Sequence, residues 1–319
     1  MSVSAGYIFS RGLHLPVFVD ANIAPTTLTH SYAILNSAGG VTQTISEPWY
    51  TQRLNPATGV ILNGYSSVNS WYNGGIFTVR KPMAHGVELL FNYTYSKSID
   101  DGAVAGANGT FFGTDPPLNP FNQKAENSLS DLDQRHRFVG SVVYAPQFFK
   151  KIPNKGLRYA LDGFVFSSIT TLASGQPVFA TISGFPSGGV DYGVNGAEIT
   201  NTGGSTGGRP PQVGRNVYIG HPLYNEDLRI TRDFAIKEKY HFQILGEAFN
   251  LFNHTNISSV NGTAFNFTPV GSGACTTALA GSTNGCLVPN AAFLAPTSSS
   301  STNGLYGARQ LQVSAKITF

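Results

Sequence analysis

Apolar and polar residues alternate with a period of two along several stretches of the chain. In the clearest stretch, Leu311, Val313, Ala315, Ile317 and Phe319 alternate with Gln310, Gln312, Ser314, Lys316 and Thr318. Successive side chains of a β-strand point to opposite faces, so this stretch has one apolar face and one polar face. Residues 87–96 and 240–244 repeat the alternation. The chain is therefore predicted to be built mainly from strands.

The pattern predicts about ten strands, separated by connections of two kinds. The strands lie near residues 2–10, 28–36, 41–49, 66–80, 86–97, 134–145, 157–183, 223–235, 240–252 and 306–319. Short connections (37–40, 81–85, 146–156 and 236–239) alternate with long ones (11–27, 50–65, 98–133, 184–222 and 253–305). In a meander of antiparallel strands, this order places every long connection at one end of the sheet and every tight turn at the other.

The sorting of connections by length discriminates among all-β architectures. A β-sandwich does not sort its loops in this way, and a propeller would show a repeat of roughly 40–50 residues, which the sequence lacks. Outer-membrane barrels have strands of about 10 residues with an apolar outer face, a polar lumen, short periplasmic turns and long outer loops. The sequence therefore predicts an all-β fold: an antiparallel up-and-down transmembrane β-barrel segment, forming part of a barrel. Its long loops would face outside, and its last strand would run inward.

Composition narrows the class of protein further. Gly and Pro make up 54 of 319 residues, which disfavours a mostly helical protein because both destabilise helices. A hydrophobic share of 41% excludes a disordered chain, and a net charge of +3 is too small to indicate nucleic acid as a partner. The sequence contains no run of about 18 apolar residues, so it predicts no transmembrane helix. The first residues show no signal peptide, and we interpret them as the interior of a strand in a fragment of a larger protein.

Four segments resemble barrel strands of TonB-dependent outer-membrane receptors, in particular the Oar-like group. Residues 134–144 (QRHRFVGSVVY) resemble a late barrel strand, and residues 247–256 (EAFNLFNHTN) resemble the penultimate strand. Residues 309–319 resemble the closing strand, and residues 7–15 (YIFSRGLHL) resemble another strand with its outer rim. The similarity runs over most of the chain.

The resemblance implies a barrel of about 22 strands with an N-terminal plug. Such receptors bind a ligand outside the cell and import it with energy passed through TonB. Residues 1–319 would then be the C-terminal portion of the barrel, with no plug domain, and the TonB complex would be contacted only through the missing plug. The implied partners are the lipid of the bacterial outer membrane and an unknown extracellular ligand, with no cofactor.

Cys275 and Cys286 both lie in the last long connection. A disulfide between them would close a loop of about a dozen residues and contribute roughly 3 kcal/mol. Two free thiols or a metal-binding pair are the alternatives. The Gly-rich surroundings and an oxidising compartment favour the disulfide.

No residue pattern indicates a catalytic or metal site. The densest charged cluster contains Asp131, Asp133, Arg135, His136 and Arg137. One interpretation is a calcium or acid–base site; the other, which we favour, is mutual ion pairing at the rim of a polar lumen. The pairs Asp100-Asp101 and Glu226-Asp227 are interpreted in the same way. The seven His form no zinc-binding pair, and no Ser lies in a nucleophile elbow, so we expect no enzymatic activity.

Aromatic residues in the predicted outer loops either contact a sugar or peptide ligand or pack the loops against one another. They include Phe111, Phe112, Phe185, Tyr192 and Tyr218. The first functional hypothesis is a barrel segment of a receptor and transporter that takes part in TonB-dependent uptake. The alternative is a secreted or surface all-β adhesin without a channel. A β-rich secreted hydrolase ranks last because the sequence shows no site for it.

Overall fold

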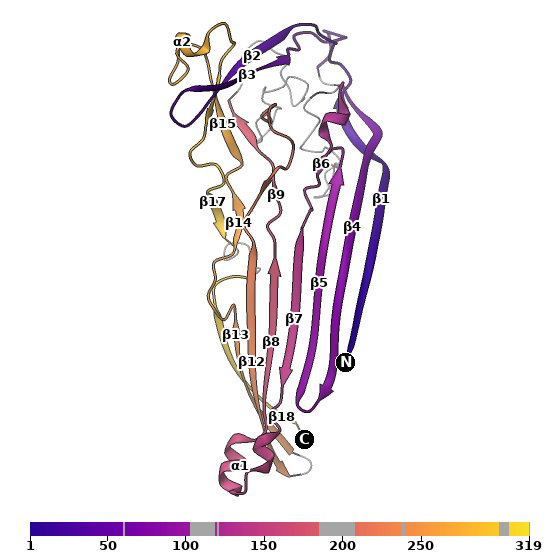
Figure 1. The fold of residues 1–319 in the computed structure, drawn as a ribbon, viewed down its shortest axis with the longest axis vertical. Coiled ribbons are helices and arrows are strands. Elements are labelled where there is room, and N and C mark those ends of the chain that lie inside the picture. The colour runs from indigo at the N-terminus through magenta and orange to yellow at the C-terminus, as the bar shows by residue number, and fades with distance from the viewer. Residues whose placement is uncertain are drawn as a thin grey trace.

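A computed structural model describes residues 1–59, 61–102, 119, 121–184, 208–237, 240–299 and 306–318. Its main element is a tall antiparallel sheet, here called the wall, which contains eight long strands and the short β6 (Ser128–Leu129). The long strands are β1 (Ser2–Asp20), β4 (Leu62–Ala84), β5 (Val87–Asp100), β7 (His136–Tyr144), β8 (Phe164–Ala173), β12 (Leu223–Lys237), β13 (Tyr240–Phe249) and β18 (Gln310–Thr318). Figure 1 shows them side by side along the long axis of the molecule.

The wall is a meander in the order β1-β4-β5-β7-β8-β12-β13-β18, and every pairing along it is antiparallel. Among the described residues, β1 pairs only with β4 and β18 only with β13, so the sheet is not closed. The long connections lie at one end of the wall, here called the loop end, and the short ones at the other, the turn end (Figure 1). The predicted meander of antiparallel strands is therefore confirmed.

The two faces of the wall differ in chemistry. One register row of the apolar face runs through Ala5, Phe77, Tyr93, Phe138, Leu172 and Tyr224. The apolar residues of β18 share this face: Val313 lies beside Gly246, which lies beside Ile230. Leu311, Val313 and Ile317 are 76%, 80% and 66% exposed, Ala315 is also exposed, and Phe319 lies outside the described residues. The opposite face carries polar rows such as Arg229, Glu247 and Gln312.

The structure corrects several predicted strands. Residues 28–36 and 41–49 contain β2 (Thr29–Leu35) and β3 (Val41–Pro48), but these strands pair with each other outside the wall. The predicted loop 11–27 is largely strand, because β1 continues to Asp20 opposite β4. The predicted strand 157–183 is divided into the end of α1 (Lys155–Leu161), β8, β9 (Pro177–Val178) and β10 (Thr181–Ser183). Alternation is a local signal, and it does not show which sheet a strand joins.

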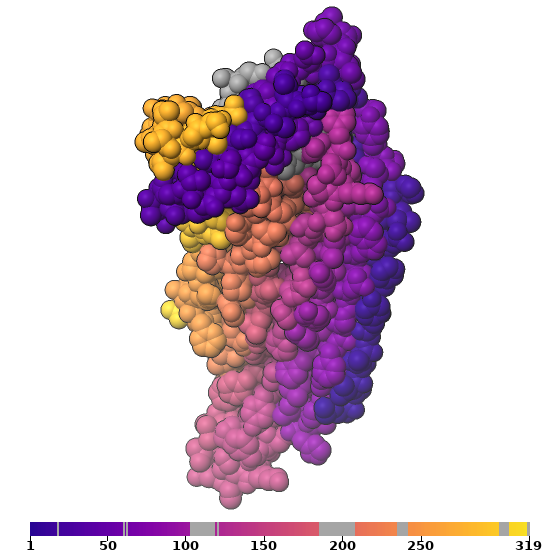
Figure 2. All heavy atoms as spheres, turned by 45° about the horizontal axis from the view of Figure 1, so that its top comes forward, coloured from indigo at the N-terminus to yellow at the C-terminus, as the bar shows by residue number. Residues whose placement is uncertain are grey.

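A second sheet, here called the cap, covers the loop end. Its strand order is β10-β15-β16-β2-β3, with β15 (Thr263–Thr268) and β16 (Cys286–Pro289). These strands come from three different long connections of the wall, so the predicted loop 253–305 is largely folded. Figure 2 shows the segment that carries β2 and β3 beside the orange segment that carries α2 (Thr277–Ala280). Two strand pairs accompany the cap: β9 with β11 (Tyr218–Ile219), and β14 (Ile257–Val260) with β17 (Pro296–Ser299).

Most of the buried apolar core lies in the cap. One cluster contains Tyr32, Ile34, Ile45, Ile182 and Leu287, with Phe265 and Phe267 packed against it. A second contains Ala33, Leu35 and Ala280 around the disulfide between Cys275 and Cys286, whose Cα atoms are 5.5 Å apart. Because β2 contributes to both clusters, it is buried on its two faces and holds the cap together.

Short helical segments lie at both ends of the wall. At the loop end, η1 (Gln123–Glu126) precedes β6. At the turn end, the connection between β7 and β8 folds into η2 (Phe148–Lys151) and α1 (Figure 1). In the part of the chain that the structure describes, no helix has the length and apolar character needed to cross a membrane.

Candidate functional site

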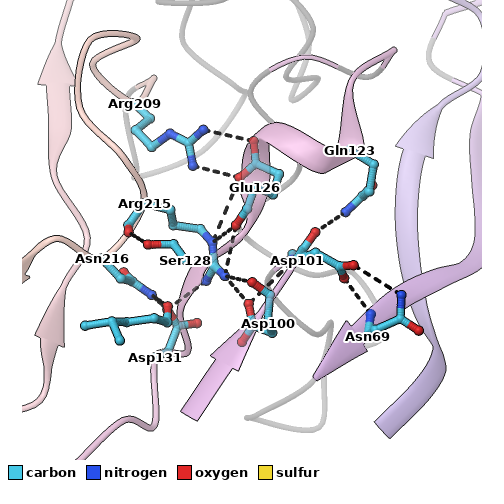
Figure 3. Close-up of polar contacts among 12 residues, drawn as sticks. Asn69, Asp100, Asp101, Gln123, Glu126, Ser128, Asp131, Arg209, Arg215 and Asn216 are labelled. Carbon is cyan, nitrogen blue, oxygen red and sulfur yellow. Dashed lines mark hydrogen bonds and ion pairs between the residues drawn. The ribbon is translucent and has the colours of Figure 1, made fainter. Parts of the chain in front are cut away.

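A network of buried charges joins the wall to the segment that precedes β11. Arg209 and Arg215 lie on this segment, Glu126 ends η1, and Asp100 ends β5. All four residues are less than a tenth exposed. Figure 3 shows the guanidinium groups of both arginines directed toward the carboxylates of Glu126 and Asp100. The network therefore holds a long loop connection against the wall.

Glu126 accepts two parallel hydrogen bonds from Arg209. Nη1 of the arginine donates to Oε2 at 2.7 Å, and Nη2 donates to Oε1 at 2.9 Å. Bidentate pairs of this kind are stronger and more directional than single hydrogen bonds. The Glu126 carboxylate also lies 3.9 Å from Nε of Arg215, so it interacts with both arginines.

Arg215 is the centre of the network and is 2% exposed. Its guanidinium forms an ion pair with Asp100 and lies 3.4 Å from Oδ1 of Asp131. The neighbouring Asn216 donates from its side chain to Asp131 and, at 2.9 Å, to the carbonyl of Leu129. A buried charge is tolerated only when it is paired and hydrogen-bonded, and these contacts meet that condition for Arg215.

The other aspartate of the Asp100-Asp101 pair connects wall strands and η1. Asp101 accepts from the backbone N–H of Asn69 at 2.5 Å and from its side-chain amide at 3.1 Å. Nε2 of Gln123 donates to the carbonyl of Asp101 at 2.6 Å. The two adjacent carboxylates thus face different partners and do not form a shared site.

The five residues of the predicted charged cluster are distributed over several sites. Asp131 joins the Arg215 network, whereas Asp133 accepts from the N–H of Ser98 at 2.6 Å and pairs with Arg135 at 3.2 Å. His136 contacts the hydroxyl of Tyr93 at 2.7 Å through Nδ1. Arg137 donates to the side chain of Gln134 at 3.4 Å. Among the described contacts, only Asp133 and Arg135 of the five thus pair with each other, and the other three have partners outside the cluster.

The Glu226-Asp227 pair is divided in the same way between the two faces of the wall. Glu226 accepts from the hydroxyls of Ser168 and Thr170 on β8. Asp227 accepts from the side chain of Asn225 at 3.0 Å and from the N–H of Asn250 at 2.9 Å. Both carboxylates therefore reinforce strand pairing near the loop end.

A cavity of about 640 Å³ lies at the loop end, beside β9, β11 and β14. It is lined by residues 174–179 after β8, by Gly220 and His221, by residues 256–260 around β14, and by Gln134 and Tyr306. Its polar groups are amides, hydroxyls and one imidazole, and its apolar groups include Val178, Phe179 and Ile257. No carboxylate, ammonium or guanidinium lines it among the described residues. Such a surface suits an uncharged ligand with hydrogen-bonding groups.

Metal binding finds no support in the described residues. They contain no group of three or more His, Cys, Asp and Glu side chains arranged to hold an ion. The two cysteines are joined to each other, so they do not form a free thiol pair.

Of the aromatic residues predicted in the outer loops, the structure describes only Tyr218. Its ring packs edge-on against Phe293, with ring centroids 4.8 Å apart, as expected of a residue that packs loops against one another. Phe111, Phe112, Phe185 and Tyr192 lie outside the described residues.

Sequence reasoning missed the residues that organise the loop end. Arg209, Arg215 and Glu126 are isolated in the sequence, and up to 89 positions separate the partners within this group. The one local signal was the Arg209-Pro210-Pro211 triplet, which restricts the backbone directly after a Gly-rich stretch.

These features define a class of protein. An antiparallel meander with an exposed apolar face, a polar opposite face, long connections at one end and short ones at the other is the arrangement of a transmembrane β-barrel. The chain belongs to the outer membrane beta barrel domain family, whose model matches residues 1–312, and it is therefore located in the bacterial outer membrane. No curated protein and no solved structure matches the chain.

Proposed function

We propose that the chain supplies wall and cap to an outer-membrane receptor that takes part in TonB-dependent uptake of an extracellular ligand. The observation that carries this proposal is the cavity at the loop end, which is lined by residues from three long connections of the wall: β5 to β7, β8 to β12 and β13 to β18. A cavity lined in this way provides a shaped surface at the outer mouth of a barrel. The resemblance of residues 134–144 and 247–256 to TonB-dependent receptors supports the same assignment.

The chemistry of the cavity suggests the class of ligand. Hydrogen-bonding groups such as Gln176 and His221 alternate with apolar ones such as Val178 and Phe179. Uncharged polar molecules, such as an oligosaccharide or a small neutral peptide, match this lining. In this proposal the chain performs no catalysis. The contact with TonB would be made by the plug domain of such a receptor.

Uptake assays test the proposal and its adhesin alternative together. Cells that carry or lack the gene are compared in tonB-positive and tonB-deleted backgrounds, with a panel of labelled neutral oligosaccharides and peptides as probes. The proposal expects gene-dependent accumulation inside the cell that disappears without tonB, while binding at the surface persists. Gene-dependent binding with no accumulation in either background would favour the adhesin.

A cavity variant links the uptake to this site. Gln176→Trp adds a bulky ring to an exposed position that lines the cavity, so it is expected to weaken both binding and accumulation. Gln147→Trp is the matched control because Gln147 is exposed at the turn end, beside η2. Equal effects of the two variants would contradict the assignment of the cavity.

A further inference from the structure

The connection between β7 and β8 differs from the two other short connections at the turn end. Residues 148–162 form η2 and α1 and contain Lys150, Lys151, Lys155 and Arg158 but only one acidic residue, Asp162. The rest of the chain has 16 basic and 16 acidic residues, so this segment carries the whole formal charge of +3. Outer-membrane barrels place short turns in the periplasm, so this positive charge lies on the periplasmic side.

A buried cation lies directly against this segment, on the lipid-facing side of the wall. Arg232 of β12 is in register with Phe164 of β8 and with Ile244 of β13. Ile244 is in turn paired with Ala315, so Arg232 shares the apolar face. It occupies the register position two residues below Ile230 toward the turn end, where the apolar face meets the interface.

The guanidinium of Arg232 is held by rings and backbone carbonyls. Its Cζ lies 4.4 Å from the ring centroid of Phe234, 5.2 Å from that of Phe164 and 6.0 Å from that of Tyr159. It donates to the carbonyl of Asp233 at 2.6 Å and to the carbonyl of Tyr159. Arg232 is 8% exposed, yet no carboxylate among the described residues forms an ion pair with it. The guanidinium of Arg232 is thus buried and forms no ion pair within that part of the chain.

This arginine lines a cavity of about 500 Å³ together with the basic residues of α1. Lys155 and Arg158 contribute two further cations, and Asp162 and Asp233 contribute two carboxylates. Oδ1 of Asp162 accepts a hydrogen bond from the N–H of Gly163 at 2.9 Å. No ion pair to Lys155 or Arg158 is formed within the described residues, so both remain available to a ligand.

The surroundings of the cavity are those of a membrane interface. Phe148, Leu157 and Tyr159 are 57%, 51% and 60% exposed, next to the cationic side chains. Aromatic rings and basic residues gather at the level of lipid headgroups, where the rings enter the acyl region and the cations remain near phosphates. Helices with apolar and basic faces bind anionic lipid surfaces for the same reason.

We propose that this cavity binds the phosphate group of an anionic phospholipid in the periplasmic leaflet, with Lys155, Arg158 and Arg232 as its cationic ligands. The planar guanidinium groups offer paired N–H donors to phosphate oxygens. The acyl chains of the lipid would follow the apolar face of the wall above Arg232. This inference does not depend on the proposed uptake function, because it concerns the opposite end of the barrel.

Lipid retention measured by native mass spectrometry tests the site. The full chain in a nanodisc of zwitterionic lipid is supplied with phosphatidylglycerol, and the retained phosphatidylglycerol is counted per protein. Lys155→Ala with Arg158→Ala is expected to weaken retention about 25-fold, since each basic residue near an anionic lipid surface contributes a factor of about five to binding. The matched control combines Lys97→Ala with Lys316→Ala, which removes the same charge from exposed positions outside the cavity. Equal loss in both double variants would overturn the proposal.

Three further measurements keep the test decisive. A heat-dependent shift in gel mobility reports whether each variant has folded. Arg232→Lys retains the positive charge but removes the planar guanidinium, so a smaller loss of retention is expected than in the double alanine variant. Inorganic phosphate at millimolar concentration distinguishes the source of the anion. Retention of phosphatidylglycerol in its presence supports a lipid site, and displacement by phosphate alone would contradict it.

Discussion

Arg209 and Glu126 form a bidentate ion pair although 83 residues separate them in the sequence. Their side chains are 6% and 3% exposed, so the pair lies almost entirely out of water. It connects the segment before β11 to η1, and Arg215 extends the connection to β5 through Asp100. The geometry of the loop end therefore depends on a few buried charges as well as on the apolar core of the cap.

Removal of one partner of this network is expected to release the segment before β11. Glu126→Gln removes the negative charge that both buried arginines face. Breaking a buried ion pair in this way destabilises a protein by about 3–5 kcal/mol. Hydrogen exchange of residues 208–219 should become faster, while the amides of β7 and β8 stay protected. Glu247→Gln is the control: Glu247 is 11% exposed but its partner Arg229 is 54% exposed, and an ion pair with a partner in water contributes about 0–1 kcal/mol. Similar acceleration in both variants would contradict the role of the network.

The terminal strand offers a direct test of which face meets lipid. Val313 lies on the apolar face and Gln312 on the polar face of β18. Val313→Arg should destabilise the folded barrel by about 2–4 kcal/mol if the site is at mid-depth, whereas Gln312→Arg should have a small effect. Refolding into lipid vesicles at increasing urea concentrations measures both. Equal tolerance of arginine at the two positions would refute the assignment of the faces.

The sequence predicted the wall well because its signal is local. Alternation along residues 310–318 and 87–96 identifies strands with two different faces, and the lengths of the connections determine the meander. The cap was not predictable in the same way. Its strand β2 is buried on both faces and pairs with β16, about 250 residues away, and single-sequence periodicity carries no information on such partners.

The charged residues of the candidate site were also hard to predict, because their partners are distant in the sequence. The acidic and basic residues near Asp131 were visible as a group, but Arg215, the partner of Asp131, comes from a different connection. An isolated arginine in a Gly-rich stretch has no pattern that assigns it a role. Arg232 was equally hidden, because its significance depends on the three rings that surround it in the fold.

The disulfide should stabilise the cap and leave the wall unaffected. Cys275 and Cys286 are 11 residues apart, and closing a loop of this length contributes about 3 kcal/mol in the chain-entropy model. Replacing both cysteines by serine should therefore accelerate hydrogen exchange in β2 and β16, with unchanged protection in β5 and β7. Reductant added to the wild-type protein should reproduce the effect, and no additional effect of reductant is expected in the double variant. Unchanged exchange in β2 after verified reduction would show that the apolar clusters alone hold the cap.

The cap should loosen as the pH falls through the histidine range, because of His30. Its ring stacks on Trp49 with centroids 4.0 Å apart, and burial lowers the pKa of His30 below its ordinary value of about 6.5. The unfolded state then binds the proton more readily than the folded state, so stability is lost as the pH falls from about 7.5 through the ordinary histidine value. Burial raises the pKa of Glu47, the cross-strand partner of His30. Protonation of Glu47 at lower pH therefore acts in the opposite direction and favours the folded cap.

Hydrogen exchange of β2 and β3, corrected for the intrinsic effect of pH, should accelerate over this pH interval in the wild type and in Glu47→Gln. His30→Phe keeps a ring against Trp49 but does not titrate, and a response of normal size in this variant would assign the pH dependence to another group.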